Sequence, residues 1–134
     1  MYKTILVPTD GTPLSDKAIS AAVQYAQKHP ECKIIGLSVA EPVPLSDYEH
    51  HAQEIAREKV TRIAELAQAA NVSHETLVRG PAKPHEEIVR VANEYHCDCI
   101  FMASHGRKGL DKIFIGSETQ KVLAMTDIPV LVYR

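Results

Sequence analysis

Five short apolar runs alternate with four longer amphipathic stretches along the 134 residues of the chain. Each run has the length of a strand, and the stretch between two runs is too long for a hairpin turn. Strands separated in this way pair in parallel through crossover connections, and a parallel sheet needs helices on both of its faces. The sequence therefore predicts an α/β fold with one doubly wound sheet of five parallel strands. The expected strands are residues 3–9, 33–40, 72–79, 97–103 and 128–133.

The stretches between these runs carry apolar residues at helical spacing. We expect Ser15 or Leu14 to begin the first helix, Asn71 to end the second and Ser117 to cap the last. No linker, internal repeat or low-complexity tract interrupts the pattern, so residues 1–134 are expected to form one domain. The expected helices are residues 15–29, 47–70, 85–95 and 117–125.

Composition and charge exclude several classes of protein. The formal net charge of −2 argues against a general nucleic-acid binder, which would show a basic excess. No apolar run has the roughly eighteen residues needed to cross a bilayer, and the first residues resemble a core strand rather than a signal peptide. The three cysteines are an odd number and indicate no disulfide framework. These features are typical of a cytoplasmic protein with neither a membrane nor a nucleic acid as its partner.

A glycine-bearing segment joins the fourth strand to the last helix. It contains Gly106, Gly109 and Gly116, with Arg107 and Lys108 between the first two. Glycine lets backbone N–H groups approach an anion closely, and the first turn of a helix presents unpaired donors. The segment therefore indicates a phosphate site. Arg107 and Lys108 would either reach phosphate oxygens or remain solvated, and the spacing fits neither a Walker loop nor the dinucleotide fingerprint.

Written as Ala103-x2-Gly106-x9-Gly116-Ser117, this segment resembles the Gly-x2-Gly-x9-Gly-[Ser/Thr] motif of nucleotide-binding universal stress proteins. Ala103 stands where the motif has its first glycine. Residues 5–10 and 128–132 are also similar to that family, so the resemblance spans the chain. It implies a Rossmann-like sheet with strand order 3-2-1-4-5 and a ligand crevice between the first and fourth strands. It also implies a homodimer formed through the C-terminal strand, Val130–Tyr133.

The resemblance implies an adenine nucleotide, ATP with or without Mg²⁺, as the bound ligand. In such members the acidic residue after the first strand contacts the nucleoside, and backbone atoms at the end of the second strand hold the adenine edge. Asp10 and Val39 stand at these positions, although Asp10 could instead be a turn residue that bonds its own backbone. The expected nucleotide-binding residues are Pro8, Thr9, Asp10, Val39, Met102, Ala103, Ser104, His105, Gly106, Arg107, Gly116, Ser117, Glu118 and Thr119.

Three other groups of residues resemble reactive sites. Cys97 and Cys99, two apart on one strand, should share one face as buried thiols, because Cys-x-Cys lacks the usual metal-ligand spacing. The pair at 50–51 and the His-Glu-Glu run at 85–87 are expected to be surface charge, because adjacent helical residues do not share a face. His105 is expected to be a hydrogen-bond donor or a spacer rather than a general base. No metal site and no catalytic group is predicted.

These observations favour a homodimeric, ATP-binding universal stress protein that acts as a stress-response or regulatory module. We expect no enzyme activity beyond slow ATP hydrolysis, because no residue is evidently placed to orient water. The alternative is a nucleotide-free protein-interaction module of the same fold, in which Ala103 marks a lost site. Nucleotidyltransferases and ATP pyrophosphatases are disfavoured, because residues 9–13 lack the His-x-Gly-His or Ser-Gly-Gly-x-Asp-Ser sequence of those enzymes.

Overall fold

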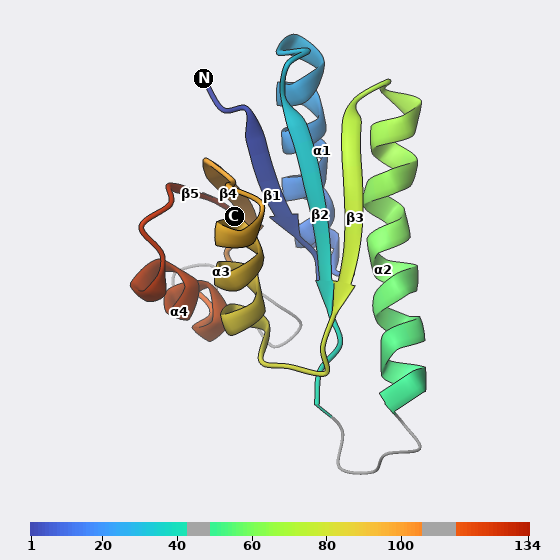
Figure 1. Ribbon diagram of the computed structural model, residues 1–134, viewed down its shortest axis with the longest axis vertical. Coiled ribbons are helices and arrows are strands. Elements are labelled where there is room, and N and C mark those ends of the chain that lie inside the picture. Colours follow the sequence, from blue (N-terminus) through green and yellow to red (C-terminus); the bar gives the residue numbers. More distant parts are fainter. Residues whose placement is uncertain (43–48, 106–114) are drawn as a thin grey trace.

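The computed structural model describes residues 1–42, 49–105 and 115–134. Strands and helices alternate along these residues, as predicted (Figure 1). The strands are β1 (Thr4–Pro8), β2 (Lys33–Val39), β3 (Ser73–Arg79), β4 (Cys99–Ala103) and β5 (Val130–Tyr133). The helices are α1 (Pro13–Lys28), α2 (Glu49–Ala69), α3 (Pro84–Glu94) and α4 (Ser117–Met125).

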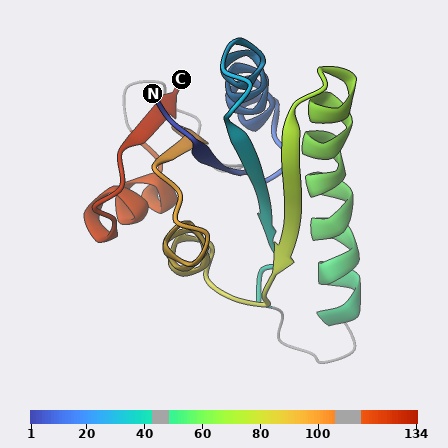
Figure 2. The ribbon, with the colours of Figure 1, turned by 45° about the horizontal axis from the view of Figure 1, so that its top comes forward.

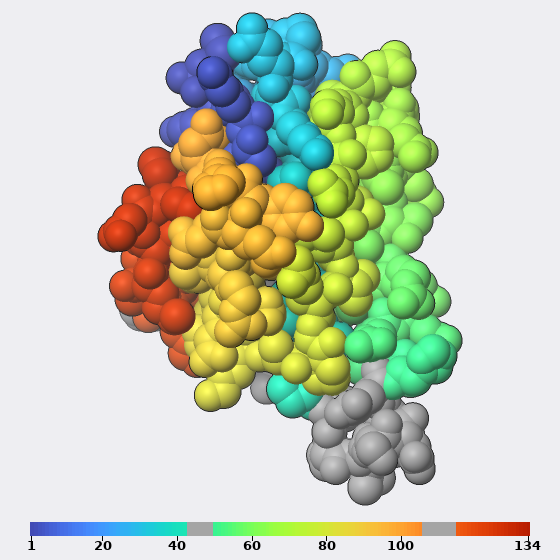
Figure 3. Space-filling view, in the orientation of Figure 1, coloured from blue at the N-terminus to red at the C-terminus, as the bar shows by residue number. Residues whose placement is uncertain are grey.

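The strands form one parallel sheet in the order β3-β2-β1-β4-β5, which confirms the predicted fold class and strand order. Helices α1 and α2 pack on one face of the sheet, and α3 and α4 pack on the other (Figure 2). The side chains of α3 and α4 cover neighbouring parts of the second face (Figure 3). The strand order reverses between β1 and β4, so the carboxyl ends of these two strands open a crevice.

The sheet is buried on both faces, which explains the uninterrupted apolar runs in the sequence. Ile5 and Val7 of β1 pack with α1 and α2, whereas Leu6 packs with α3 and α4. Successive side chains of a strand point to opposite faces, so each face requires its own apolar residue. Within the described part of the chain, none of the helices combines the length and apolar character that a membrane crossing requires.

Helix α1 begins earlier than the sequence suggested. Thr12 is its N-cap, with a side-chain oxygen that accepts the Ser15 N–H at 3.2 Å, and Pro13 is the first helical residue. The prediction of Ser15 or Leu14 was therefore wrong. Proline fits the first helical position because its missing N–H has no intrahelical partner there. In the sequence, the pair Thr12-Pro13 indicates this helix start.

The two other predicted helix boundaries had different outcomes. The prediction that Ser117 caps α4 was wrong, because Gly116 is the N-cap and no side chain caps the helix. Ser117 is instead the first helical residue. The expectation for Asn71 is confirmed: it follows the end of α2 with φ 55°, a left-handed conformation that asparagine tolerates better than most residues.

The three cysteines are free and buried. Burial was predicted for Cys97 and Cys99, but these two do not share a face. Cys97 packs with the α3 and α4 side chains, and Cys99 packs with those of α1 and α2. The prediction was wrong because β4 begins only at Cys99, so strand alternation does not apply to Cys97. The residues that the structure describes contain no His, Cys, Asp and Glu cluster able to hold a metal ion.

Burial of the thiols predicts a loss of stability at alkaline pH. Desolvation raises the pKa of Cys97 to about 12 and that of Cys32 to about 11, from 9.0. As the pH rises from about 9 to about 12, the unfolded chain loses thiol protons that the folded chain keeps. The free energy of unfolding should therefore fall across this window. Below the window, these two thiols should not make it change with pH.

Urea unfolding of the parent protein and of a Cys32→Ala/Cys97→Ala variant, measured over this pH range, tests the prediction. The variant should lose stability less steeply with pH than the parent. Comparison of the two slopes removes the contribution of lysines and tyrosines, which titrate in both proteins. Equal slopes would show that the Cys32 and Cys97 thiols do not contribute to the alkaline instability.

Candidate functional site

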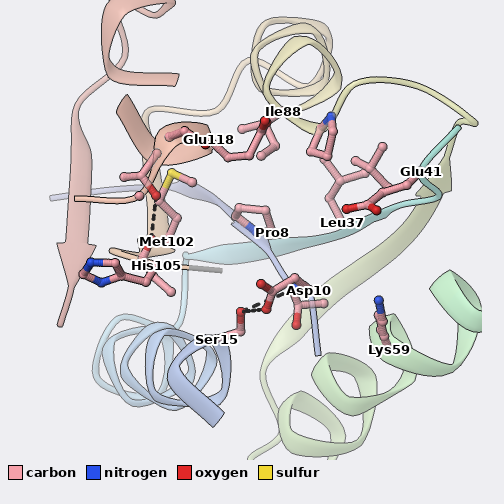
Figure 4. Close-up of a pocket in the computed structure, with 17 residues that line it drawn as sticks. Pro8, Asp10, Ser15, Leu37, Glu41, Lys59, Ile88, Met102, His105 and Glu118 are labelled. Atoms are coloured by element: carbon pink, nitrogen blue, oxygen red, sulfur yellow. Dashed lines mark hydrogen bonds between the residues drawn. The ribbon is translucent and has the colours of Figure 1, made fainter. Parts of the chain in front are cut away.

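A cavity of about 660 Å³ opens at the carboxyl ends of β1, β2 and β4 (Figure 4). Its walls also include α2, the N-terminal half of α3 and the first turn of α4. Most of the residues expected from the sequence line it, although they come from separate strands and loops. They are Pro8, Thr9, Asp10, Val39, Met102, Ala103, His105, Gly116, Ser117, Glu118 and Thr119.

Three residues of the expected set do not appear in this lining. Ser104 is buried beside the cavity, where its amide N–H donates to the Tyr133 carbonyl at 2.6 Å. Gly106 and Arg107 lie outside the residues that the structure describes, as do Lys108 and Gly109. Their predicted contacts with phosphate remain predictions.

Asp10 orders the turn between β1 and α1. Its Oδ1 accepts three hydrogen bonds, from the Thr12 N–H at 3.0 Å, the Thr12 hydroxyl at 2.6 Å and the Ser15 hydroxyl at 2.7 Å. The turn interpretation of Asp10 is therefore correct, since the carboxylate bonds the backbone two residues later. Asp10 also lines the cavity. One carboxylate thus holds the start of α1 and forms part of the cavity wall.

The end of β4 is tied to the start of α4 by two hydrogen bonds. The Gly116 N–H donates to the Ser104 carbonyl at 2.7 Å, and the buried Thr119 hydroxyl donates to the Ala103 carbonyl at 2.9 Å. The first amides of a helix have no acceptor inside it and carry a partial positive charge. Because Ser117 and Glu118 line the cavity, this donor-rich end of α4 lies at its wall.

His105 lines the cavity, and one nitrogen of its ring is buried. Its Nδ1 lies 2.9 Å from the Ser104 hydroxyl oxygen, and this contact fixes the ring orientation. Its Nε2 is buried and has no hydrogen-bond partner among the described residues. Buried polar atoms in native proteins are nearly always paired, so this nitrogen has the capacity for one further hydrogen bond.

Comparison with known proteins identifies the family. The profile of the universal stress protein family matches residues 1–134. The chain belongs to the universal stress protein family.

Relatives of this universal stress protein match it along its whole length. A universal stress protein of Thermus aquaticus is 31% identical, over all of both chains. The structure of MJ0577 of Methanocaldococcus jannaschii is 28% identical and covers 99% of this chain and 96% of its own, with a TM-score of 0.81. A universal stress protein solved in complex with cAMP is 25% identical over 99% of this chain and 97% of its own, with a TM-score of 0.68.

One wall of the cavity in this universal stress protein is largely apolar. Leu37 and Val39 contribute from β2, and Pro84 and Ile88 contribute from α3. Such a surface suits a flat aromatic ring, because apolar contacts provide most of the binding energy in ligand cavities. Of these four residues, sequence reasoning found only Val39.

Two charged residues also line the cavity, beyond this apolar wall. Glu41 follows β2, and Lys59 projects from α2 (Figure 4). The methylene stem of Lys59 passes over Gly11, where an added Cβ would lie 3.0 Å from the Lys59 Cγ. Sequence reasoning missed Glu41, Lys59 and Ser15, because no local motif marks residues that the fold brings together.

A hydrogen-bonded pair connects α3 to α4 beside the cavity. Glu118 Oε2 accepts from the His85 backbone N–H at 2.9 Å and lies 2.8 Å from His85 Nδ1. The His85 side chain is only 12% exposed, so the prediction of surface charge was wrong for this residue. It was also wrong for Glu87, which is buried and pairs with Arg90. Glu86 is exposed, as predicted.

The other expectations about side-chain burial are confirmed where the structure describes them. His50 and His51 are exposed, and His50 pairs with Glu54 of the next turn at 3.0 Å. Strand alternation puts Ala103 on the same face of β4 as Cys99, so its methyl group points toward the α1 side of the sheet.

Proposed function

We propose that this universal stress protein is an adenine-nucleotide-binding regulatory module with ATP as its ligand, rather than an enzyme that turns the nucleotide over. The cavity at the crevice between β1 and β4 carries the proposal, because the donor-rich first turn of α4, the Asp10 carboxylate and an apolar wall converge there. Ligands of open α/β sheets bind at this point of the topology. The related protein in complex with cAMP supports an adenine ring and a phosphate as the ligand class.

The chemistry of the walls suggests how a nucleotide would be held. The first turn of α4 would bind phosphate through its backbone amides and the Ser117 hydroxyl. Asp10 would accept a hydrogen bond from a sugar hydroxyl. The apolar wall that contains Leu37 and Ile88 would contact the base.

Regulation follows from the absence of evident catalytic groups in the part of the chain that the structure describes. His105 is the histidine that lines the cavity, and its Nδ1 already contacts Ser104; the Asp10 carboxylate is engaged with Thr12 and Ser15, and that of Glu118 with His85. Fast phosphoryl transfer also needs an oriented nucleophile, and no described residue is evidently placed to orient one. A bound nucleotide would then act as a signal through the protein's conformation or contacts.

Titration calorimetry with ATP, together with mass analysis of the protein as purified, tests this function. We expect saturable binding of one nucleotide per chain, and tripolyphosphate alone should bind more weakly because it lacks the base. Parallel titrations with Mg²⁺ and with EDTA determine whether the cation is required. Ala103→Gly, which restores the family motif, should bind at least as tightly. Absence of both binding heat and co-purified nucleotide would overturn the proposal in favour of a nucleotide-free interaction module.

We also propose that two copies of the chain associate through β5. This strand forms one edge of the sheet, so one side of its backbone has no strand partner in the monomer. The Leu131 side chain is 40% exposed there, and exposed apolar edge strands are normally covered. Pairing with the same strand of a second copy would cover both edges under two-fold symmetry.

Leu131→Glu is expected to convert the dimer to monomer, because it adds two buried like charges across the two-fold axis. Sedimentation velocity measures the outcome. Ile55→Glu is the matched control, because Ile55 has a similar exposure, 38%, but lies on α2, away from β5. A dimer that persists in Leu131→Glu would exclude this strand as the interface.

A further inference from the structure

The described walls of the cavity carry more negative than positive side chains. Asp10, Glu41 and Glu118 contribute carboxylates, and Lys59 contributes an ammonium group. A phosphate-bearing ligand brings further negative charge into this site. Like charges repel strongly at short range in a partly desolvated cleft, so the position of each carboxylate affects which ligands bind.

Glu118 is the carboxylate nearest in sequence to the expected phosphate position. It stands in the first turn of α4, between Ser117 and Thr119, both of which line the cavity. A carboxylate at a helix N-terminus interacts favourably with the same partial positive charge that would attract a phosphate. A carboxylate free to turn back over this helix end would therefore compete with the ligand.

The structure holds this carboxylate away from its own helix end. Glu118 Oε2 bonds the backbone N–H and the Nδ1 of His85, which lies in the first turn of α3. Glu118 Oε1 lies 3.8 Å from the Lys121 ammonium, one turn later on α4. Figure 4 shows the Glu118 side chain extending toward Ile88 of α3. The charge therefore stays at the cavity wall, and these contacts direct it toward α3 rather than over the first amides of α4.

We infer that Glu118, positioned by His85, is a specificity-determining residue that penalises ligands in proportion to their phosphate charge. The inference rests on the proposed nucleotide site and deepens it. ATP carries more negative charge than AMP, so the Glu118 carboxylate lowers the affinity for ATP more than that for AMP. His85 limits the penalty, because its two hydrogen bonds keep the carboxylate off the phosphate position.

The test is the ratio of ATP affinity to AMP affinity, measured by calorimetry in EDTA at low ionic strength. Glu118→Gln keeps the shape and one acceptor oxygen while removing the charge. It should raise the ratio on the order of three- to tenfold, with the larger change in ATP binding. Added salt should reduce this change through screening. Glu86→Gln is the matched control, because it removes a charge from an exposed position in α3 that does not line the cavity.

His85→Ala tests the positioning role separately. Loss of the imidazole removes one of the two bonds to Glu118 Oε2, so the ratio should fall in this variant. In the double variant with Glu118→Gln, the His85 substitution should have no further effect on the ratio, because no carboxylate charge remains to be positioned. A His85 effect that persists in the double variant would overturn the positioning role and assign the effect to the imidazole itself.

The outcomes distinguish this inference from the function on which it rests. If the parent binds both nucleotides and Glu118→Gln changes the ratio no more than Glu86→Gln does, the inference is wrong and the nucleotide site stands. If the parent binds neither nucleotide, the proposed function is wrong and the inference fails with it. Circular dichroism and urea unfolding of each variant separate a changed site from a lost fold.

Discussion

Replacing Gly116 with valine is expected to lower nucleotide affinity about 10- to 100-fold while the protein stays folded, because overfilling a fitted site costs roughly 1–3 kcal/mol. Gly116 lines the cavity at the start of α4, where the proposed site binds phosphate. Any side chain at this position adds bulk to that wall. Calorimetry with ATP measures the loss, and Gly116→Ala should give an intermediate effect.

The backbone of Gly116 explains why the fold should tolerate the change. Its φ of −63° and ψ of 157° are extended values that valine adopts readily. The hydrogen bond from its N–H to the Ser104 carbonyl would remain, since valine keeps the amide. Valine is a poorer N-cap than glycine, so we expect a stability loss of about 0.5–1 kcal/mol. Unchanged nucleotide affinity would exclude the start of α4 as the phosphate site.

Gly80→Ala is expected to destabilise the fold by about 2–4 kcal/mol, because the change adds both strain and a collision. Gly80 has φ 100°, a conformation that residues with a side chain rarely adopt. A Cβ on Gly80 would lie 2.4 Å from the carbonyl oxygen of Ala40, a backbone atom that cannot rotate away. The urea midpoint measures the effect.

Gly11→Ala provides the control for Gly80→Ala. Gly11 also has a left-handed φ, 81°, but the three atoms nearest to its added Cβ all belong to the flexible Lys59 side chain. Gly11→Ala should therefore lower the free energy of unfolding by about 1 kcal/mol, the backbone penalty alone. Similar losses of stability in the two variants would mean that the backbone near Ala40 shifts to accommodate the added Cβ more easily than its contacts imply. Gly80→Ala should also weaken ligand binding, since residues 80–83 lead into the α3 wall of the cavity.

The sequence predicted the fold well because strand burial leaves a strong local signal. Runs such as Ile5 to Val7 are apolar at every position, since both faces of a parallel sheet are covered. Helix starts were predicted less well, because several polar residues near a boundary can serve as caps. Thr12 rather than Ser15 caps α1, and Ser15 bonds back toward Asp10 instead.

The residues of the candidate site also fall into those that the sequence could predict and those that it could not. Gly116, Ser117 and the residues after β1 could be found because each belongs to a short contiguous motif. Lys59 and Ile88 could not, because α2 and α3 reach the cavity only after the chain has folded. The pairing of His85 with Glu118 joins residues 33 positions apart, and no local pattern in either segment indicates it.

The shared duties of Asp10 have a consequence for comparing sequences of this fold. Its Oδ1 holds Thr12 and Ser15 at the start of α1, so an aspartate is useful at this position even in a protein that binds no ligand. Gly116 has a weaker structural duty as the N-cap of α4, because its backbone conformation is open to any residue. A glycine retained there reports a need for space at the cavity wall. Gly116 is therefore a better diagnostic of ligand binding in a homologue than the acidic residue after the first strand.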